Sequence, residues 1–299
     1  MKSTSIILLT RSGVIAIMGC VLMSCATVED TIYMQGLDVS GPLNLPPLHT
    51  NNDSIASKIS ISPHWNIVNG DPIQGAVEYN QYSLPGNNLN WKYPVSTFGI
   101  DLDARVSSLV ALSFGLNYAS MGQEGLAGGS AGIGFMFRGD DAMGRFELGG
   151  QIQSMKYDAS SVVKQTVTSW FSSSPTTTIA YFHDIGTSSP FGYYGSLILQ
   201  SRNLTRVFDI FGQLGVSRQG LTSFTPHTEV AFLGVITSIN TDTQTSNSAT
   251  FFTLTPGCTF NLGNNSRLLA AVRIMKELEI SGDQNNFLYQ PVVQFDIGL

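Results

Sequence analysis

The stretch 98–118 reads FGIDLDARVSSLVALSFGLNY. On both sides of Ser107-Ser108, large apolar residues alternate with Gly, Asp, Ser and Asn, so every second side chain belongs to the same face. Two alternating runs joined by a short polar turn predict a β-hairpin with one apolar and one polar face. No window of the chain shows a convincing helical stripe.

The same period of two recurs along most of the chain. It predicts further hairpins over 131–152, 193–217 and 252–275, a last strand over 293–299 and a first strand within 55–66. We therefore expect about ten strands, within a range of eight to twelve. The turns inside the hairpins are short, whereas the connections between hairpins, at about 67–96, 120–129, 157–190, 218–250 and 277–287, are long and polar. Alternating short and long connections are typical of a transmembrane β-barrel with short periplasmic turns and long outer loops.

Alternation alone also fits a soluble exported β-sandwich or a soluble barrel, so other features must decide between them. Charged residues make up 12% of the chain, about half of the roughly 25% usual in soluble domains. The predicted strands are close to the 9–11 residues that cross a bilayer at a tilt, and aromatic residues lie near their ends. These features predict an all-β fold, a closed antiparallel up-and-down barrel in the outer membrane. The excess of 21 acidic over 15 basic residues argues against nucleic acid as a partner.

The N-terminal region has the features of an export signal. Lys2 and Arg11 precede a short apolar run, which leads into Leu22-Met23-Ser24-Cys25. This last stretch resembles the lipobox of bacterial lipoproteins. The resemblance implies that residues 1–24 are a signal peptide and that Cys25 is the lipid attachment site, with Cys20 as the weaker alternative. Residues 25–54 then form a lipid-anchored, Pro-rich tether, and residues 55–299 form the barrel. With both barrel ends on the periplasmic side, we expect the anchor in the inner leaflet of the outer membrane.

These features together support one resemblance. The lipobox, the Pro-rich tether and repeated strand starts such as RFELGGQ (145–151) and VFDIFGQ (207–213) resemble small outer-membrane β-barrel proteins of Gram-negative bacteria, in the lipid-anchored variety. The resemblance implies outer-membrane lipid, the barrel assembly machinery and the lipoprotein export machinery as partners, and loops exposed at the cell surface. Its motifs are specific for architecture and nearly silent on activity.

Charged residues also occur on the polar face of the predicted strands. We expect them to point into the barrel and to form an interior charge network: Asp101, Asp103, Arg105, Arg138, Glu147, Asp209, Arg273 and Asp296. Because an unpaired buried charge is costly, the network should be a paired plug that holds the shape of the barrel, with a polar pathway or proton relay as the alternative. We expect Arg105 and Arg273 to bridge to Asp101 and Asp103.

The long loops are the remaining place for function, because binding residues concentrate on connections held by a rigid scaffold. Trp170 and Phe171, in a Ser/Thr-rich run, are candidates for binding an extracellular protein, glycan or lipid. We therefore expect a structural or surface-interaction protein, with no metal, cofactor or catalysis.

Two other functions stay open. The first is a narrow, porin-like diffusion channel. The second is an outer-membrane protease or lipase: a family of ten-stranded outer-membrane proteases uses acid and histidine pairs, for which His183-Asp184 and His227 with Glu229 are the nearest candidates. Adjacent side chains of a strand point to opposite faces, which weakens the first pair.

Overall fold

A computed structural model gives the fold, and it describes residues 26–43, 45–50, 58–68, 72–75, 88–121, 124–169, 175–201, 207–224, 227–232, 235–240, 245–263, 265–278 and 287–299. Nearly all of these residues lie in strands, and cis peptide bonds are absent among them. Within these ranges no helix is long and apolar enough to span a membrane.

Ten antiparallel strands form a closed barrel. In order around the barrel they are β11 (Phe191–Ser201), β12 (Phe208–Phe224), β15 (Thr245–Asn261), β16 (Ser266–Glu277), β17 (Phe287–Gly298), β2 (Ile59–Ile67), β5 (Ser96–Arg105), β6 (Val110–Met121), β7 (Glu124–Arg138) and β8 (Ala142–Gln153). The last strand, β17, pairs with the first, β2, and the amide of Leu299 donates to the carbonyl of Ile59 at 3.0 Å. Both ends of the barrel sequence therefore lie at the end with the short turns, here called the turn end. The predicted ten-stranded fold is confirmed.

The outer surface of the barrel is an apolar belt. Leu112, Phe114, Ile133 and Phe260 are exposed by 38%, 53%, 38% and 37%, while Asp101 and Glu147 on the opposite face are exposed by 4% and 0%. In a soluble barrel this arrangement would be reversed, because the large apolar side chains would fill the interior. Hydrocarbon lipid is the solvent that makes an apolar exterior and a polar interior stable, so the barrel is of the transmembrane class.

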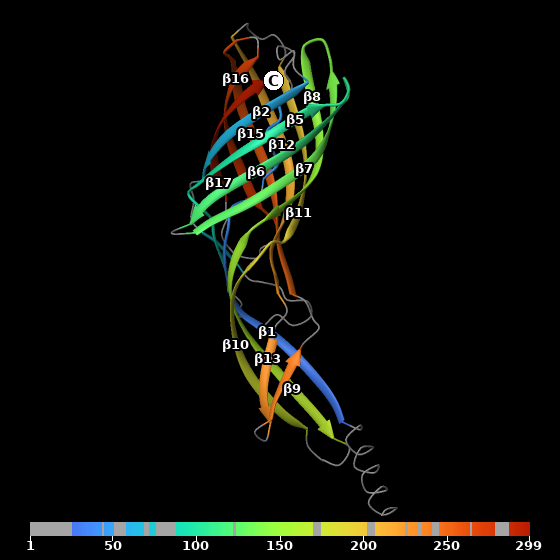
Figure 1. The fold of residues 1–299 in the computed structure, drawn as a ribbon, viewed down its shortest axis with the longest axis vertical. Coiled ribbons are helices and arrows are strands. Elements are labelled where there is room, and N and C mark those ends of the chain that lie inside the picture. The colour runs from blue at the N-terminus through green and yellow to red at the C-terminus, as the bar shows by residue number, and fades with distance from the viewer. Residues whose placement is uncertain are drawn as a thin grey trace, which may run out of the picture.

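The second end of the barrel, here called the loop end, continues into a long extension (Figure 1). β8 leads into β9 (Met155–Ser169), which pairs with β10 (Thr176–Ser188), and β10 returns into β11. β12 and β15 also run past the barrel, and β13 (His227–Phe232) and β14 (Val235–Asn240) form a hairpin between them. The predicted long connections at 157–190 and 218–250 thus contain strands. The predicted long connection at 120–129 is wrong: β6 and β7 extend to Met121 and from Glu124, so their turn is tight.

The part of the predicted tether that the structure describes, residues 26–43 and 45–50, instead begins with a strand. Ala26–Ser40 form β1, the central strand of a five-stranded sheet in the order β10-β9-β1-β4-β3, where β4 is Asn88–Lys92 and β3 is Ile73–Gly75. β1 is antiparallel to β9 and parallel to β4. The prolines that argue against a helix begin at Pro42, after the strand has ended, so they do not oppose β1.

An apolar cluster closes the loop end of the barrel. The sheet contributes Leu37, Val39, Leu89, Trp91, Met155 and Ala159, and the barrel strands contribute Leu221, Ala249, Phe251, Met275 and Leu288. Trp91 is fully buried, its ring packs edge-on against Phe251 at 5.6 Å, and its Nε1 donates to the carbonyl of Gly41 at 3.1 Å. The core of the protein therefore lies across the barrel mouth, where it joins the sheet to the barrel.

The belt can be tested with two Leu→Arg variants, one within β6 and one in the turn that precedes it. Leu116 and Leu109 are exposed by 71% and 63%, but Leu116 lies within the belt and Leu109 in the turn. An arginine on the lipid face costs about 2–4 kcal/mol near the midplane and about 0–1 kcal/mol near the interface. In liposomes, Leu116→Arg should lower the urea midpoint of unfolding, followed by heat-dependent gel mobility, far more than Leu109→Arg. Equal effects would show that lipid does not cover this face.

Candidate functional site

The candidate site is the barrel lumen, which holds a segment of the chain itself. This lumen segment, residues 41–43 and 45–50, follows β1 and runs from the loop end to the turn end. Pro42 is hydrogen-bonded to Gln219 near the loop end of β12, and Pro46 is hydrogen-bonded to Arg273 further toward the turn end. Thr50 is hydrogen-bonded to Arg267 beside the β15–β16 turn. The segment therefore passes through the whole barrel before the chain returns as β2.

Inward-facing Gln and Arg side chains hold the lumen segment by its backbone. Five carbonyl groups accept hydrogen bonds of 2.8–3.1 Å: Pro42 from Gln219, Pro46 from Arg273, Pro47 from Gln213, Leu48 from Gln294 and Thr50 from Arg267. Arg267 also donates to the Thr50 hydroxyl. Contacts to carbonyl groups fix the path and register of the segment.

The prolines of the segment suit this arrangement. Pro42, Pro46 and Pro47 have no backbone N–H, so they bring acceptors into the lumen without bringing donors that would need partners. The barrel wall at these positions offers donors. Acceptors on the segment and donors on the wall therefore satisfy one another, and Leu48 adds an apolar contact within a buried cluster with Ile198, Phe211, Leu269, Ala271 and Val292.

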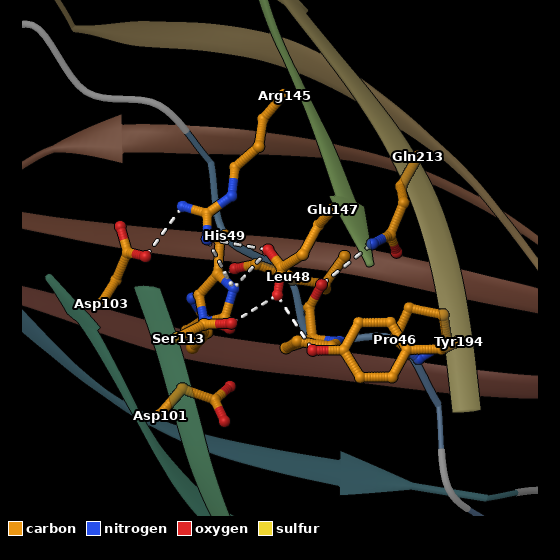
Figure 2. A network of polar contacts seen from close by, with 12 residues as sticks. Pro46, Leu48, His49, Asp101, Asp103, Ser113, Arg145, Glu147, Tyr194 and Gln213 are labelled. Atoms are coloured by element: carbon orange, nitrogen blue, oxygen red, sulfur yellow. Dashed lines mark hydrogen bonds and ion pairs between the residues drawn. The ribbon is translucent and has the colours of Figure 1, made fainter. Parts of the chain in front are cut away.

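Glu147 is the centre of the polar network in the lumen (Figure 2). One oxygen accepts from the Ser113 hydroxyl at 2.6 Å and the Tyr194 hydroxyl at 3.0 Å. The other lies 2.9 Å from His49 Nδ1 and 2.8 Å from Arg145 Nη2. These four partners come from β6, β11, the lumen segment and β8 itself, so the carboxylate ties the segment to the wall.

Two glycines make room for this network. A Cβ at Gly132 would lie 2.5 Å from the Tyr194 hydroxyl and 2.9 Å from the Glu147 carboxylate, and a Cβ at Gly149 would lie 2.4 Å from the Tyr194 ring. The absence of a side chain at these two positions therefore leaves space on the inner face of the wall for the contact between the tyrosine and the carboxylate.

Ion pairs also hold three further interior carboxylates, those of Asp101, Asp103 and Asp296. Asp103 pairs with Arg145 Nη1 at 2.8 Å, so this arginine bridges Asp103 and Glu147. Asp101 lies 3.2 Å from His64 Nδ1. Asp296 accepts from Arg267 at 2.8 Å and from the Gln294 amide at 2.7 Å. Removing one partner of such a buried pair costs about 3–5 kcal/mol, which gives the lumen a single favoured arrangement.

The predicted interior residues mostly lie where the alternation placed them. Asp101, Glu147, Asp209, Arg273 and Asp296 are buried, and Asp103 and Arg105 are half-buried. Arg138 is exposed at the turn end, because its strand has already reached the barrel rim, so its inclusion in the interior was wrong.

The expected bridge from Arg273 is replaced by other contacts, whereas the bridge from Arg105 stays a prediction. Asp101 and Asp103 contact His64 and Arg145, while Arg273 donates to the Pro46 carbonyl and to Gln290 at 3.1 Å. Arg273, which we expected to bridge to the two aspartates, binds the lumen segment instead.

Sequence reasoning missed four residues of the network: His49, His64, Arg145 and Arg267. Arg145 and Arg267 stand in phase with Glu147 and Arg273, so the same alternation could have found them. His64 is in phase with Ser62 and Asn66 on β2, which are also buried. His49 gave no such signal, because it belongs to the segment that was predicted to be a tether.

Other predicted residues lie elsewhere. Cys25, Cys20, Trp170 and Phe171 fall outside the described residues. His183 Nε2 lies 2.5 Å from Asp158 on the exposed surface of the extension, whereas Asp184 accepts from the Tyr157 hydroxyl at 3.2 Å. The adjacent His183 and Asp184 thus have different partners, as expected for neighbours in a strand. Partial burial and then the nearby Asp184 carboxylate raise the pKa of Tyr157.

The chemistry of the lumen network is that of a structural anchor. The Ser113 hydroxyl donates to Glu147 and not to His49, which differs from the serine–histidine contact that activates a nucleophile. Arg145 balances the carboxylate, and Glu147 is 0% exposed. Among the described residues, no group of three or more His, Cys, Asp or Glu side chains could hold a metal ion.

Comparisons with known proteins find likenesses among solved structures only. No protein-family model and no curated protein matches the sequence. Among solved structures, the chain is similar to the KdgM porin (9% identity, TM-score 0.33, 80% of this chain and 99% of that one) and to Neisserial surface protein A (7%, 0.29, 81% and 98%). It is also similar to the outer membrane protease OmpT from Escherichia coli (8%, 0.30, 80% and 90%).

A disulfide can test whether the segment lies in the lumen. A Cβ at Gly215 on β12 would lie 3.1 Å from the Pro46 ring and 2.5 Å from the Thr253 hydroxyl. Pro46→Cys with Gly215→Cys, in a Thr253→Ala background that relieves the crowding, should therefore form a disulfide when the folded protein is oxidised. Mass spectrometry of a tryptic digest detects it. Free thiols after oxidation, in protein that still shows heat-dependent mobility, would place the segment outside the barrel.

Proposed function

We propose that the protein is a closed outer-membrane barrel that acts as a lipid-anchored surface-interaction protein, without catalysis. The observation that carries this proposal is the occupied lumen: the chain's own residues 41–43 and 45–50 fill the passage that a channel would need. The extension at the loop end then becomes the part of the molecule available to partners, with an extracellular protein or glycan as the expected ligand.

The packing of the lumen argues against a diffusion channel. Cavities beside the lumen segment have volumes of about 30 and about 20 Å³, which is room for no more than a few water molecules. The apolar cluster around Trp91 also covers the loop end. A solute would have to displace both the segment and the cluster.

The extension suits a binding role. Its strands extend well past the belt (Figure 1), and its central strand β1 is paired on one side with β9 and on the other with β4. One face of the sheet presents an exposed carboxylate, an imidazole and an aliphatic side chain, those of Asp38, His183 and Ile185. A sheet held rigidly above the belt can present such a face to a partner at low entropic cost.

Lipid anchoring and export are supported by the sequence Leu22-Met23-Ser24-Cys25 alone. Several acyl chains are needed for stable membrane attachment, which is what lipoprotein processing supplies. The expected position of the anchor near the turn end does not agree with the fold, because Ala26, next to Cys25, begins β1 on the side of the loop end. An acyl group at Cys25 would join the chain on that side.

Conductance tests the closed lumen. The refolded protein, checked by heat-dependent mobility, should show no steps in planar bilayers, because the lumen segment and the apolar cluster both block the passage. The KdgM porin provides a conducting reference on a comparable barrel. Steady ohmic steps from the unmodified protein would contradict a closed barrel and would favour the channel.

Metabolic labelling with palmitate tests the anchor. Labelled palmitate should enter the unmodified protein and the Cys20→Ser variant equally, and should be lost in Cys25→Ser. Loss in Cys20→Ser with retention in Cys25→Ser would move the attachment site. Absence of label from all three would show that the chain is exported without lipid.

A further inference from the structure

We propose that the chain crosses the membrane an additional time through its own lumen, so that the N-terminal arm, β1, is displayed on the outer surface and builds the interaction sheet there. The inference takes from the proposed function the orientation of the barrel, in which the loop end faces outward. The crossing itself does not depend on that orientation and rests on the path of residues 26–50.

The path of the chain requires the crossing. β1 runs antiparallel to β9, and β9 leaves the barrel at Met155, so β1 runs toward the barrel and ends at Ser40 beside Lys156. The lumen segment then passes Gln219, Arg273 and Arg267 in turn. β2 begins at the turn end and returns along the wall. The end of β1 at Ser40 and the start of β2 at Ile59 therefore lie at opposite ends of the barrel.

The crossing cannot be made after the sheet has formed. Neighbouring strands lie about 4.8 Å apart, so a sheet of five strands is roughly 20 Å wide, whereas side chains and the lumen segment fill the barrel interior. The arm must pass as an extended chain while the barrel is still open between β17 and β2. Closure of these two strands then locks the segment through its five carbonyl contacts.

The arm is essential to the proposed interaction surface. β1 is the middle strand of the extension, with β9 and β10 on one side and β4 and β3 on the other. Leu37 and Val39 of β1 are buried in the cluster that joins the sheet to the barrel. Without the crossing, β9 and β4 would lose their shared partner, and the binding face would be divided.

Thiol labelling on intact cells can test this topology. Asp38 on β1 and Ile185 on β10 share a cross-strand partner in Asp158 and are both exposed, whereas Asp140 is exposed in the β7–β8 turn. Asp38→Cys, Ile185→Cys and Asp140→Cys are made singly in a Cys258→Ser background and treated with a membrane-impermeant maleimide before and after permeabilisation. The background protein without added cysteine gives the baseline.

The inference predicts that Asp38→Cys and Ile185→Cys are labelled equally on intact cells, and that Asp140→Cys is labelled only after permeabilisation. Labelling of Ile185→Cys without Asp38→Cys would overturn the crossing and leave the orientation of the proposed function intact. Labelling of Asp140→Cys but not of Ile185→Cys on intact cells would overturn that orientation. In that case the crossing would still be supported if Asp38→Cys, like Ile185→Cys, were labelled only after permeabilisation. The crossing would be overturned if Asp38→Cys, like Asp140→Cys, were labelled on intact cells. If Asp38→Cys does not fold, an epitope inserted before Ala26 replaces it, with the same readings.

Discussion

A polar lumen surrounded by lipid must satisfy its own hydrogen bonds, and the rest of this structure depends on how that is done. Gln213, Gln219 and Gln294 point inward from strands whose outer faces are apolar, where bulk water does not compensate an unpaired amide. The carbonyl groups of the Pro-rich lumen segment accept hydrogen bonds from these amides. The lumen segment is therefore a plug that belongs to the same polypeptide chain as the barrel, so it cannot dissociate from it.

This constraint links the lumen to the extension. A segment that fills the barrel from end to end leaves its preceding residues at the loop end, where β1 pairs with β9 and β4. The same passage closes the lumen and supplies the central strand of the sheet above it. Glu147, which contacts His49 of the segment and Arg145, Ser113 and Tyr194 of the wall, fixes the register between the two.

Alternation in the sequence predicted the barrel because inside and outside are local properties of each strand. Phe98–Tyr118 and its repeats place apolar side chains on lipid, and the inward carboxylates follow from the same period. The lumen segment could not be predicted in this way. Its prolines indicate only an irregular path. The partners of its carbonyl groups lie between 166 residues (Gln213 for Pro47) and 246 residues (Gln294 for Leu48) away along the chain. Long-range hydrogen bonds to carbonyl groups leave no periodic signal, so a plug and a tether look alike.

The most direct measurement of the occupied lumen is a nuclear Overhauser spectrum of the folded protein in micelles with labelled proline. Pro46 should show contacts to the Hα of Gly215, since the wall and the proline ring touch at that position, together with shifts far from those of a free chain. Proline signals with only sequential contacts and free-chain shifts would contradict the account, because the barrel would then be open and the N-terminal arm would have no path to the loop end.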